Sequence, residues 1–413
     1  MKYKYICLIL ATLITSGICL GQTSQTVAVE DFKPSSVNQP DKQYPQVNSE
    51  GRVRVSISAP QALKVQFDIG AVKYDLTKDD KGVWIGECAP QDEGFHYYQL
   101  WIDGAAVPDP NSLYFYGASR WGSGIEIPAK DQDFYALKNV PHGQLRENHY
   151  FSKSTNAVRR CFVYTPPGYD EKANNRYPVL YLQHGMGENE TGWGNQGHAD
   201  LIMDNLIAEG KAKPFIIVMD NSGVNFPAGA RPGMTPRRPG TADSASTADT
   251  SHARRGGFGN FNFAEQFEKI LINELIPYID ANFRTLTDQP HRAMAGLSMG
   301  GMQTRQITLA HLDKFSHIGI FSGGSISMED VTAAPGFKEK VKLVFVSFGS
   351  RELENRRPGG GGRGPFGGDP KVNSTALKEA GINSQFYVSP LTAHEWQSWR
   401  RSLHEFAPLL FKK

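Results

Sequence analysis

Beyond about residue 49, the chain contains short runs in which apolar and polar positions alternate. One run places apolar residues at Val53, Val55 and Ile57, and similar runs occupy 63–67 and 98–102. A period of two residues, with turn-forming residues between the runs, is typical of strands that bury one face. Residues 49–130 are therefore predicted to form a small, immunoglobulin-like β-sandwich domain.

From about residue 131 onward, apolar runs alternate with segments of helical spacing. The runs at 179–182 and 215–219 are almost continuously apolar, as expected for strands buried on both faces, and 201–208 repeats at helical spacing. Further strands are predicted at 291–296, 318–321, 343–348 and 385–388, and further helices at 263–279, 303–312 and 396–406. This alternation predicts an α/β domain over 131–413, with a mostly parallel sheet and helices on both faces.

The start of the chain fits neither pattern. Residues 1–21 combine Lys2 and Lys4 with an apolar run and a small residue at Gly21, which predicts a secretory signal peptide. A membrane anchor is the alternative, although the run is shorter than the roughly 20 apolar residues of a spanning helix. Residues 22–48, rich in Ser, Thr, Gln and Pro, are predicted to be a flexible leader.

Two later segments, 221–260 and 355–369, are rich in Gly, Pro and Arg, and each follows a predicted strand. Loops at the carboxyl ends of parallel strands line the ligand crevice of an open sheet. These insertions are therefore predicted either to rim the active site or to decorate the surface without touching substrate.

The composition excludes several classes of protein. The chain has 413 residues, of which 39% are hydrophobic, and its 44 basic and 42 acidic residues give a formal charge of +2. These values exclude wholesale disorder and give no electrostatic signal for a nucleic-acid partner.

Removal of the predicted signal peptide leaves Cys88 and Cys161, so at most one disulfide is expected. The 11 histidines are scattered and no metal-binding spacing occurs, so neither a metal nor another cofactor is expected.

The strongest chemical signal is Gly-Leu-Ser-Met-Gly-Gly at 296–301. A Gly-x-Ser-x-Gly pattern alone is weak, but this one follows an apolar run and precedes a helical stretch. That context is the strand–turn–helix of a nucleophile elbow, whose strained turn leaves no room for side chains beside the serine. Ser298 is the predicted nucleophile, and a simple Gly-Ser turn is the alternative.

A serine hydroxyl needs an imidazole to take its proton and a carboxylate to orient that imidazole. In the fold that carries a nucleophile elbow, the chain order is serine, acid, histidine. His394 is the preferred histidine because it lies in a loop just after the predicted strand at 385–388. His404 falls inside the closing helix, and His311 and His317 come earlier in the chain.

The acid is expected just past the predicted strand at 343–348. Glu352 is the first choice at that position, and Glu354 is the neighbour that could replace it. Asp330 and Asp369 are more distant alternatives. Because arginines surround Glu352 in the sequence, a surface ion pair of little energetic value is the other interpretation of this carboxylate.

The oxyanion hole should pair the N–H group after the nucleophile, at Met299, with an N–H group from an early strand loop. The loop after the strand at 179–182 contains His184, Gly185 and Met186. Met186 is the predicted second donor, and Gly185 is predicted to contribute to the substrate site. His184 is expected to support this loop, because a second imidazole base is unnecessary.

Several motifs can now be taken together: His-Gly at 142–143, Val-Tyr-Thr-Pro-Pro-Gly-Tyr at 163–169, Leu-Gln-His-Gly at 182–185, Trp193, the motif at 296–301, and His-Glu-Trp at 394–396. This set resembles carbohydrate esterase family 1, the esterase D-like α/β-hydrolases. The resemblance covers most of 142–413. It implies an α/β-hydrolase fold, feruloyl or acetylxylan esterase activity, and triad roles for Ser298, Glu352 and His394.

The β-region carries a second resemblance. Trp84, Tyr97, Tyr98, Asp-Gly at 103–104 and Val-Pro-Asp-Pro at 107–110 resemble carbohydrate-binding module family 48. Such modules are often fused to esterases of this kind. The resemblance implies a carbohydrate-binding-module-like domain over 49–130, whether or not that domain has kept its binding of carbohydrate.

These features predict a secreted or periplasmic serine esterase that releases feruloyl groups from arabinoxylan-type plant cell-wall polysaccharide through an acyl-enzyme. Its expected partners are that polysaccharide and feruloylated or acetylated xylo-oligosaccharides. Trp193 and Trp396 lie close in sequence to the oxyanion loop and to His394, so they are predicted to stack on a sugar or an aromatic acyl group. Ordinary core packing is the alternative for such residues.

Three other functions remain open. An acetylxylan esterase would use the same machinery with a shorter acyl pocket. An enterochelin-type siderophore esterase would use the arginines of 221–260 to receive an anionic ligand. A polysaccharide-binding protein with an idle hydrolase fold is the alternative that is not an enzyme, and the complete set of catalytic residues argues against it.

Overall fold

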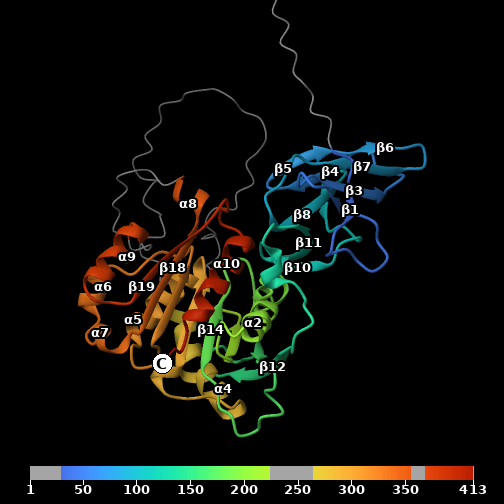
Figure 1. Ribbon diagram of the computed structural model, residues 1–413. Coiled ribbons are helices and arrows are strands. Elements are labelled where there is room, and N and C mark those ends of the chain that lie inside the picture. Colours follow the sequence, from blue (N-terminus) through green and yellow to red (C-terminus); the bar gives the residue numbers. More distant parts are fainter. Residues whose placement is uncertain (1–28, 224–263, 355–367, 413) are drawn as a thin grey trace, which may run out of the picture.

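The computed structural model describes residues 29–223, 264–354 and 368–412, which form a β-rich N-terminal domain beside a larger α/β domain (Figure 1). Within these ranges, no helix is long and apolar enough to cross a membrane. The predicted signal peptide at 1–21 and almost all of the insertions at 221–260 and 355–369 lie outside the described residues.

Two antiparallel sheets form the N-terminal domain. The first sheet contains, in spatial order, β1 (Lys33–Pro34), β2 (Gln46–Val47), β3 (Val53–Ser58), β7 (Val83–Glu87) and β6 (Thr77–Lys78). The second contains β10 (Tyr114–Gly117), β11 (Arg120–Ile127), β8 (Gly94–Ile102), β4 (Val65–Ile69) and β5 (Val72–Asp75), with β9 (Ala105–Val107) paired to β8. Alternate residues of β3, β4 and β8 fill one core between the sheets, as the period of two predicts.

The prediction of a flexible leader over 22–48 is wrong for residues 29–48. From residue 29 onward this segment packs on the sandwich, where β1 and β2 extend the first sheet and Val47 is buried. The Asn38 side chain donates to the carbonyl of Pro45 at 3.0 Å, and Asn38 forms a bridge with Ser112. The segment is held mainly by hydrogen bonds, which leave no apolar periodicity in the sequence.

An eight-stranded sheet forms the centre of the α/β domain, in the order β12, β13, β15, β14, β16, β17, β18, β19. The strands β12 (Gln144–Ser152) and β13 (Ala157–Thr165) are antiparallel to their neighbours, and the others are parallel to one another. The parallel strands are β14 (Val179–Gln183), β15 (Ile216–Asp220), β16 (Arg292–Leu297), β17 (His317–Phe321), β18 (Leu343–Gly349) and β19 (Ser384–Ser389). Every residue of β14 to β18 is buried, which explains their continuous apolar runs.

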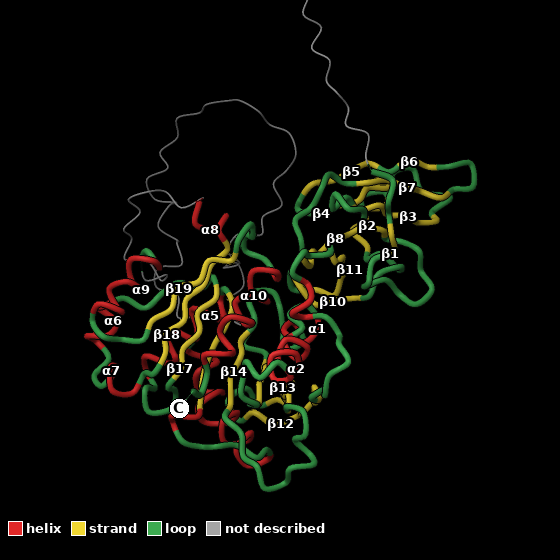
Figure 2. The backbone as a smooth tube through the Cα atoms, in the orientation of Figure 1, coloured by secondary structure: helices red, strands yellow, loops and turns green. Residues whose placement is uncertain are grey.

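Helices cover both faces of this sheet (Figure 2). On one face lie α2 (Ala199–Ala208) and α10 (Trp396–Phe406). The other face carries α3 (Glu265–Ile270), a π-helical turn (Leu271–Leu275), α4 (Ile276–Asn282), α5 (Met299–Ala310), α6 (Met328–Ala333), α7 (Phe337–Lys340) and α9 (Pro370–Glu379). Two short helices, α1 (Gly192–Asn195) and α8 (Ser350–Glu354), follow the loop after β14 and the end of β18. The predicted α/β-hydrolase arrangement with a preceding β-sandwich is confirmed.

The two domains share an apolar interface. One buried cluster contains side chains of both domains: Phe95 of β8 and Phe115 of β10 from the sandwich, and Trp193 and Trp396 from the hydrolase domain. By contrast, Cys88 lies in the sandwich core and Cys161 in a core of the hydrolase domain, and both are free thiols. The disulfide that the sequence left open does not form.

Charged contacts surround this apolar interface. Arg400 of α10 is fully buried and makes a two-pronged ion pair with Glu126 of β11, at 2.6 and 3.0 Å. Its neighbour Arg401 pairs with Asp131 at 2.7 Å in a more exposed position. Arg351, next to the predicted acid, pairs with Asp92 of the sandwich.

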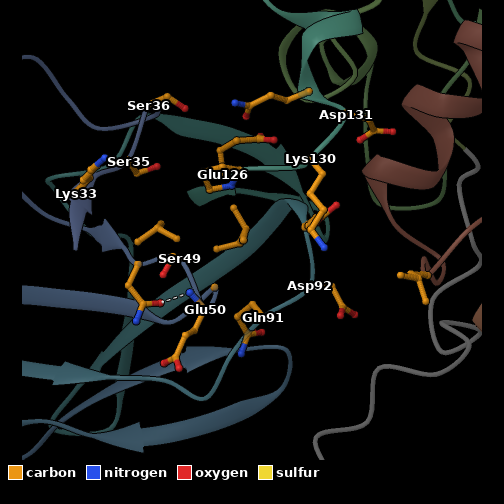
Figure 3. A pocket seen from close by; sticks show the side chains of 18 of the residues that line it. Lys33, Ser35, Ser36, Ser49, Glu50, Gln91, Asp92, Glu126, Lys130 and Asp131 are labelled. Atoms are coloured by element: carbon orange, nitrogen blue, oxygen red, sulfur yellow. Dashed lines mark hydrogen bonds between the residues drawn. The ribbon is translucent and has the colours of Figure 1, made fainter. Parts of the chain in front are cut away.

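A cavity of about 900 Å³ lies between the domains, beside these contacts (Figure 3). Lys33, Glu50 and Asp92 line it on the sandwich side, and Asp131 and the loop at 390–392 line it on the hydrolase side. None of the three predicted catalytic side chains lines this cavity. It therefore lies next to the loops that carry the histidine and the acid, and it is not the site of the reacting serine.

Candidate active site

The turn between β16 and α5 has the geometry of a nucleophile elbow. Ser298 has φ 51° and ψ −115°, a strained conformation for a residue other than glycine, and its N–H donates to the carbonyl of Phe321 at 2.8 Å. A Cβ atom at Gly296 would lie 2.4 Å from the backbone of Gly300, and one at Gly300 would lie 2.6 Å from the carbonyl of His184. The glycines of the motif are therefore needed for close packing around the serine.

The structure brings Ser298, His394 and Glu352 together. His394 Nε2 lies 2.9 Å from Ser298 Oγ, and His394 Nδ1 lies 3.0 Å from Glu352 Oε2. The three side chains come from the β16–α5 turn, the loop between β19 and α10, and the first turn of α8. This chain of hydrogen bonds is the arrangement that transfers a proton from a serine hydroxyl to an imidazole.

The carboxylate of Glu352 is held firmly in this chain. Its Oε1 atom accepts hydrogen bonds from Ser322 Oγ at 2.7 Å and from the N–H of Gly349 at 2.9 Å. Burial raises the pKa of Glu352, but the bonds from His394, Ser322 and Gly349 outweigh burial and leave the pKa below its ordinary value. Glu352 is therefore ionised at neutral pH and suited to orient His394.

The alternative acids lie elsewhere. Glu354 is exposed at the end of α8, and the structure records no hydrogen bond between it and His394. Asp330 forms the capping box of α6 with Ser327, and Asp369 caps α9.

The alternative histidines are also engaged away from Ser298. His404 on α10 contacts Glu405, and His311 contacts Glu268. His317 is buried beside Phe411, and burial lowers its pKa to about 4.

The predicted oxyanion loop lies against the nucleophile. A Cβ atom on Gly185 would lie 2.6 Å from Leu297 Cδ1 and 3.4 Å from the Cβ of Ser298, so any larger residue would displace the Leu297 side chain. Met299 is the first residue of α5, and Met186 follows Gly185. Within the described parts of the chain, neither the Met299 N–H nor the Met186 N–H has a hydrogen-bond acceptor. Both N–H groups belong to residues adjacent in sequence to Ser298 or Gly185, and they stay the predicted donors to an oxyanion.

His184 braces the same loop. Its Nε2 atom accepts a hydrogen bond from the N–H of Ser222 at 3.0 Å, so Nδ1 carries the proton and donates to the carbonyl of Gly185 at 2.7 Å. Burial lowers the pKa of His184, which favours this neutral form.

The prediction that Trp193 and Trp396 stack on substrate is wrong. Their side chains are only 1% and 2% exposed, and the two rings pack edge to face with centroids 5.5 Å apart. The Trp193 indole N–H also donates to the carbonyl of Gln183 at 2.9 Å. The two rings pack in the core next to the loop after β14, and neither has an exposed face on which a sugar ring could stack.

Sequence reasoning missed two supporting side chains. Ser322 fixes the acid, and Glu188 places a carboxyl group beside the oxyanion loop, where its Oε2 atom accepts from the N–H of Gly185 at 3.1 Å. Glu188 lies three residues past Gly185, so its position in the loop was a usable local signal. Ser322 lies 30 residues from Glu352, and no sequence pattern connects them.

Comparison with known proteins agrees with this geometry. Residues 152–355 match the family described as "Putative esterase". The chain is 44% identical, over 93% of its length, to "Endo-1,4-beta-xylanase/feruloyl esterase" of Xylanibacter ruminicola, of which it covers 48%. It is 24% identical over 62% of its length to "Endo-1,4-beta-xylanase Y" of Acetivibrio thermocellus, of which it covers 22%. The chain thus spans half or less of the length of these curated relatives.

A solved structure extends the likeness to both domains. The enterobactin esterase of Shigella flexneri superposes with a TM-score of 0.57 at 15% identity, over 87% of this chain and 92% of that one. At such low identity the match concerns the fold. The resemblance of the catalytic motifs is confirmed as a likeness to esterases, including a relative named as a feruloyl esterase, whereas the resemblance of the sandwich to module family 48 stays a prediction.

Proposed function

We propose that this chain, whose residues 152–355 match the esterase family, is a serine esterase that releases feruloyl groups from arabinoxylan-type polysaccharide. The observation that carries the proposal is the hydrogen-bonded series from Ser298 through His394 to Glu352, at 2.9 and 3.0 Å. An idle hydrolase fold would not require these three groups to be hydrogen-bonded in line, nor the N–H groups of Met299 and Met186 to lack an acceptor among the described residues.

The proposed reaction follows from this geometry. His394 Nε2 takes the proton of Ser298 as Oγ attacks the ester carbonyl, and Glu352 stabilises the resulting imidazolium. The N–H groups of Met299 and Met186 receive the oxyanion. Collapse of the tetrahedral intermediate breaks the ester bond, His394 returns the proton to the leaving alcohol, and the acyl group stays on Ser298. A water molecule, deprotonated by His394, then attacks the acyl-enzyme. The bond between the acyl carbon and Ser298 Oγ breaks, His394 returns the proton to Oγ, and the acid is released.

The feruloyl preference is supported by the Xylanibacter ruminicola relative. That protein's name joins a xylanase and a feruloyl esterase, and this chain covers 48% of it. The esterase-family match within this chain assigns it to the esterase half of the name. An exported enzyme acting on plant cell-wall polysaccharide follows from the predicted signal peptide at 1–21 and from this substrate.

The test compares rates of acid release from methyl ferulate, acetylated xylan and a ferric catecholate ester. We expect ferulate release, abolished in Ser298→Ala, with Ser58→Ala as the matched control because Ser58 is an exposed serine of the sandwich. Release of acetate alone would replace the proposal with an acetylxylan esterase, and hydrolysis of the catecholate ester alone with a siderophore esterase. Full activity in Ser298→Ala would refute the serine mechanism.

A further inference from the structure

Glu188 is an ionisable group beside the nucleophile that the proposed triad does not use. It lies in the loop between β14 and α1, and its own N–H donates back to the carbonyl of Gly185 at 3.3 Å. Its Oε2 atom accepts from the N–H of Gly185 at 3.1 Å. The carboxyl group and the main chain of Glu188 therefore close the Gly185–Glu188 turn on both sides.

This carboxyl group lies close to the reacting centre. The position that a Gly185 Cβ would occupy is 3.4 Å from Glu188 Oε2 and also 3.4 Å from the Cβ of Ser298. His394 is near enough for its positive charge to favour the ionised form of Glu188. Gly185 thus lies close to both the Glu188 carboxyl group and the nucleophile.

The sandwich holds the same turn from the other side. Glu188 Oε1 accepts from the hydroxyl of Tyr97 on β8 at 3.4 Å, and the N–H of Ser119, in the β10–β11 turn, donates to the carbonyl of Gly187 at 2.8 Å. Tyr97 is itself fixed, because its hydroxyl accepts from Gln196 at 2.7 Å and from the indole of Trp396 at 3.3 Å. The turn is clamped between its own carboxyl group and the N-terminal domain.

We propose that Glu188 is a positioning residue, which occupies the N–H of Gly185 and thereby leaves the N–H of Met186 as the donor that faces the oxyanion. The observation behind this is that the Gly185 N–H is taken, whereas the Met186 N–H has no acceptor among the described residues. Through Tyr97 the β-sandwich becomes part of the support of the oxyanion hole. The inference rests on the proposed serine mechanism.

The clamp responds to pH. Burial raises the pKa of Glu188 to about 7, against the opposing influence of Gly185 N–H, His394, Tyr97 and Trp396. Above pH 7 the carboxylate makes a charge-assisted bond to the Gly185 N–H, and below it the neutral acid makes a weaker one. The hydrogen bond by which Glu188 holds the Gly185 N–H therefore strengthens as pH rises through about 7.

Three variants of the full chain test the proposal on methyl ferulate: Glu188→Ala, Glu188→Gln and Tyr97→Phe. Loss of one oxyanion donor lowers kcat by roughly 10²–10³-fold, so we expect Glu188→Ala to lose about 10²-fold in kcat with KM changed less than about threefold. Glu188→Gln keeps an oxygen that accepts from Gly185 N–H, so it should retain activity within about tenfold. Tyr97→Phe should lose only a few-fold, because it leaves the Gly185 bond intact.

The pH dependence supplies a readout that a merely structural residue would not move. The ratio of wild-type kcat to Glu188→Gln kcat should rise through about pH 7, since only the wild type ionises at this position. A constant ratio, an unchanged kcat in Glu188→Ala, or an effect on KM alone would overturn the proposal. If Glu188→Ala does not fold, the Glu188→Gln profile decides alone. Absence of ester hydrolysis by the wild type would instead refute the serine mechanism itself.

Discussion

The buried ion pair between Arg400 and Glu126 predicts a large loss of stability when one partner is removed. Arg400 is 0% exposed, and its guanidinium donates to both oxygens of Glu126 at 2.6 and 3.0 Å and to the carbonyl of Gln196 at 2.8 Å. It also lies 4.4 Å above the ring of Tyr135. In Glu126→Gln the side-chain volume stays the same, but the positive charge of Arg400 remains buried without a counter-charge.

The magnitude follows from that burial. Leaving one charge of a buried pair unpaired costs about 3–5 kcal/mol of unfolding free energy, whereas an exposed pair contributes about 0–1 kcal/mol. The adjacent pair of Arg401 and Asp131 provides the matched control, because the Asp131 side chain is 44% exposed and pairs at 2.7 Å with an arginine of the same helix. We therefore expect Glu126→Gln to cost about 3–5 kcal/mol and Asp131→Asn to cost about 1 kcal/mol or less.

The assay is urea unfolding followed by tryptophan fluorescence, with Trp193 and Trp396 as reporters near this interface. A third variant, Glu126→Met with Arg400→Met, removes both charges and should recover most of the loss. Equal destabilisation by Glu126→Gln and Asp131→Asn, or a double variant no better than the single one, would refute the reasoning that burial sets the cost.

Three further predictions concern the catalytic acid, the thiols and acid stability. Glu352→Gln should lower kcat by about 10²–10⁴-fold, whereas Glu354→Gln should stay within about twofold; the reverse order, measured on methyl ferulate, would assign the acid to Glu354. Cys88 and Cys161 are buried free thiols, so a chain lacking residues 1–21 should react with a thiol reagent only after unfolding, which thiol titration checks. Because the chain has no disulfide between them, adding a reductant should not shift its Tm. Burial lowers the pKa of His317 to about 4, below its value in the unfolded chain. The stability gained by burying the neutral imidazole is therefore fully present above about pH 6.5 and is lost as pH falls toward 4. The loss should amount to about 3 kcal/mol and be absent in His317→Gln, as urea midpoints at pH 7 and pH 4 would show.

The sequence predicted those features that depend on local pattern and chain order. The buried strands have continuous apolar runs, and the helix predicted at 396–406 matches α10 at both ends. Ser298, Glu352 and His394 meet at the carboxyl ends of parallel strands of one sheet, so their positions after β16, β18 and β19 were sufficient to predict that they lie together.

The features that were missed depend on contacts between distant residues. Trp396 lies beside His394 in the sequence, yet the sandwich and Trp193 cover its ring, and nothing local indicates this. Arg400 and Glu126 are 274 residues apart, so a fully buried arginine could not be distinguished from an exposed one on the closing helix. The packed segment after residue 29 was missed for a related reason, because hydrogen bonds to distant main-chain groups leave no periodic pattern.

The continuous apolar cluster that joins the two domains restricts how this chain can be recombined. In a hybrid enzyme with an unrelated β-domain in place of 29–130, the apolar cluster of the hydrolase domain would lose the packing of Phe95 and Phe115. The buried charge of Arg400 would also lose its counter-charge, Glu126. Any successful transplant must carry these three residues along with the sandwich. The two domains must therefore be exchanged together. A β-domain from another protein can replace this one only if it presents the same interface residues to the hydrolase domain.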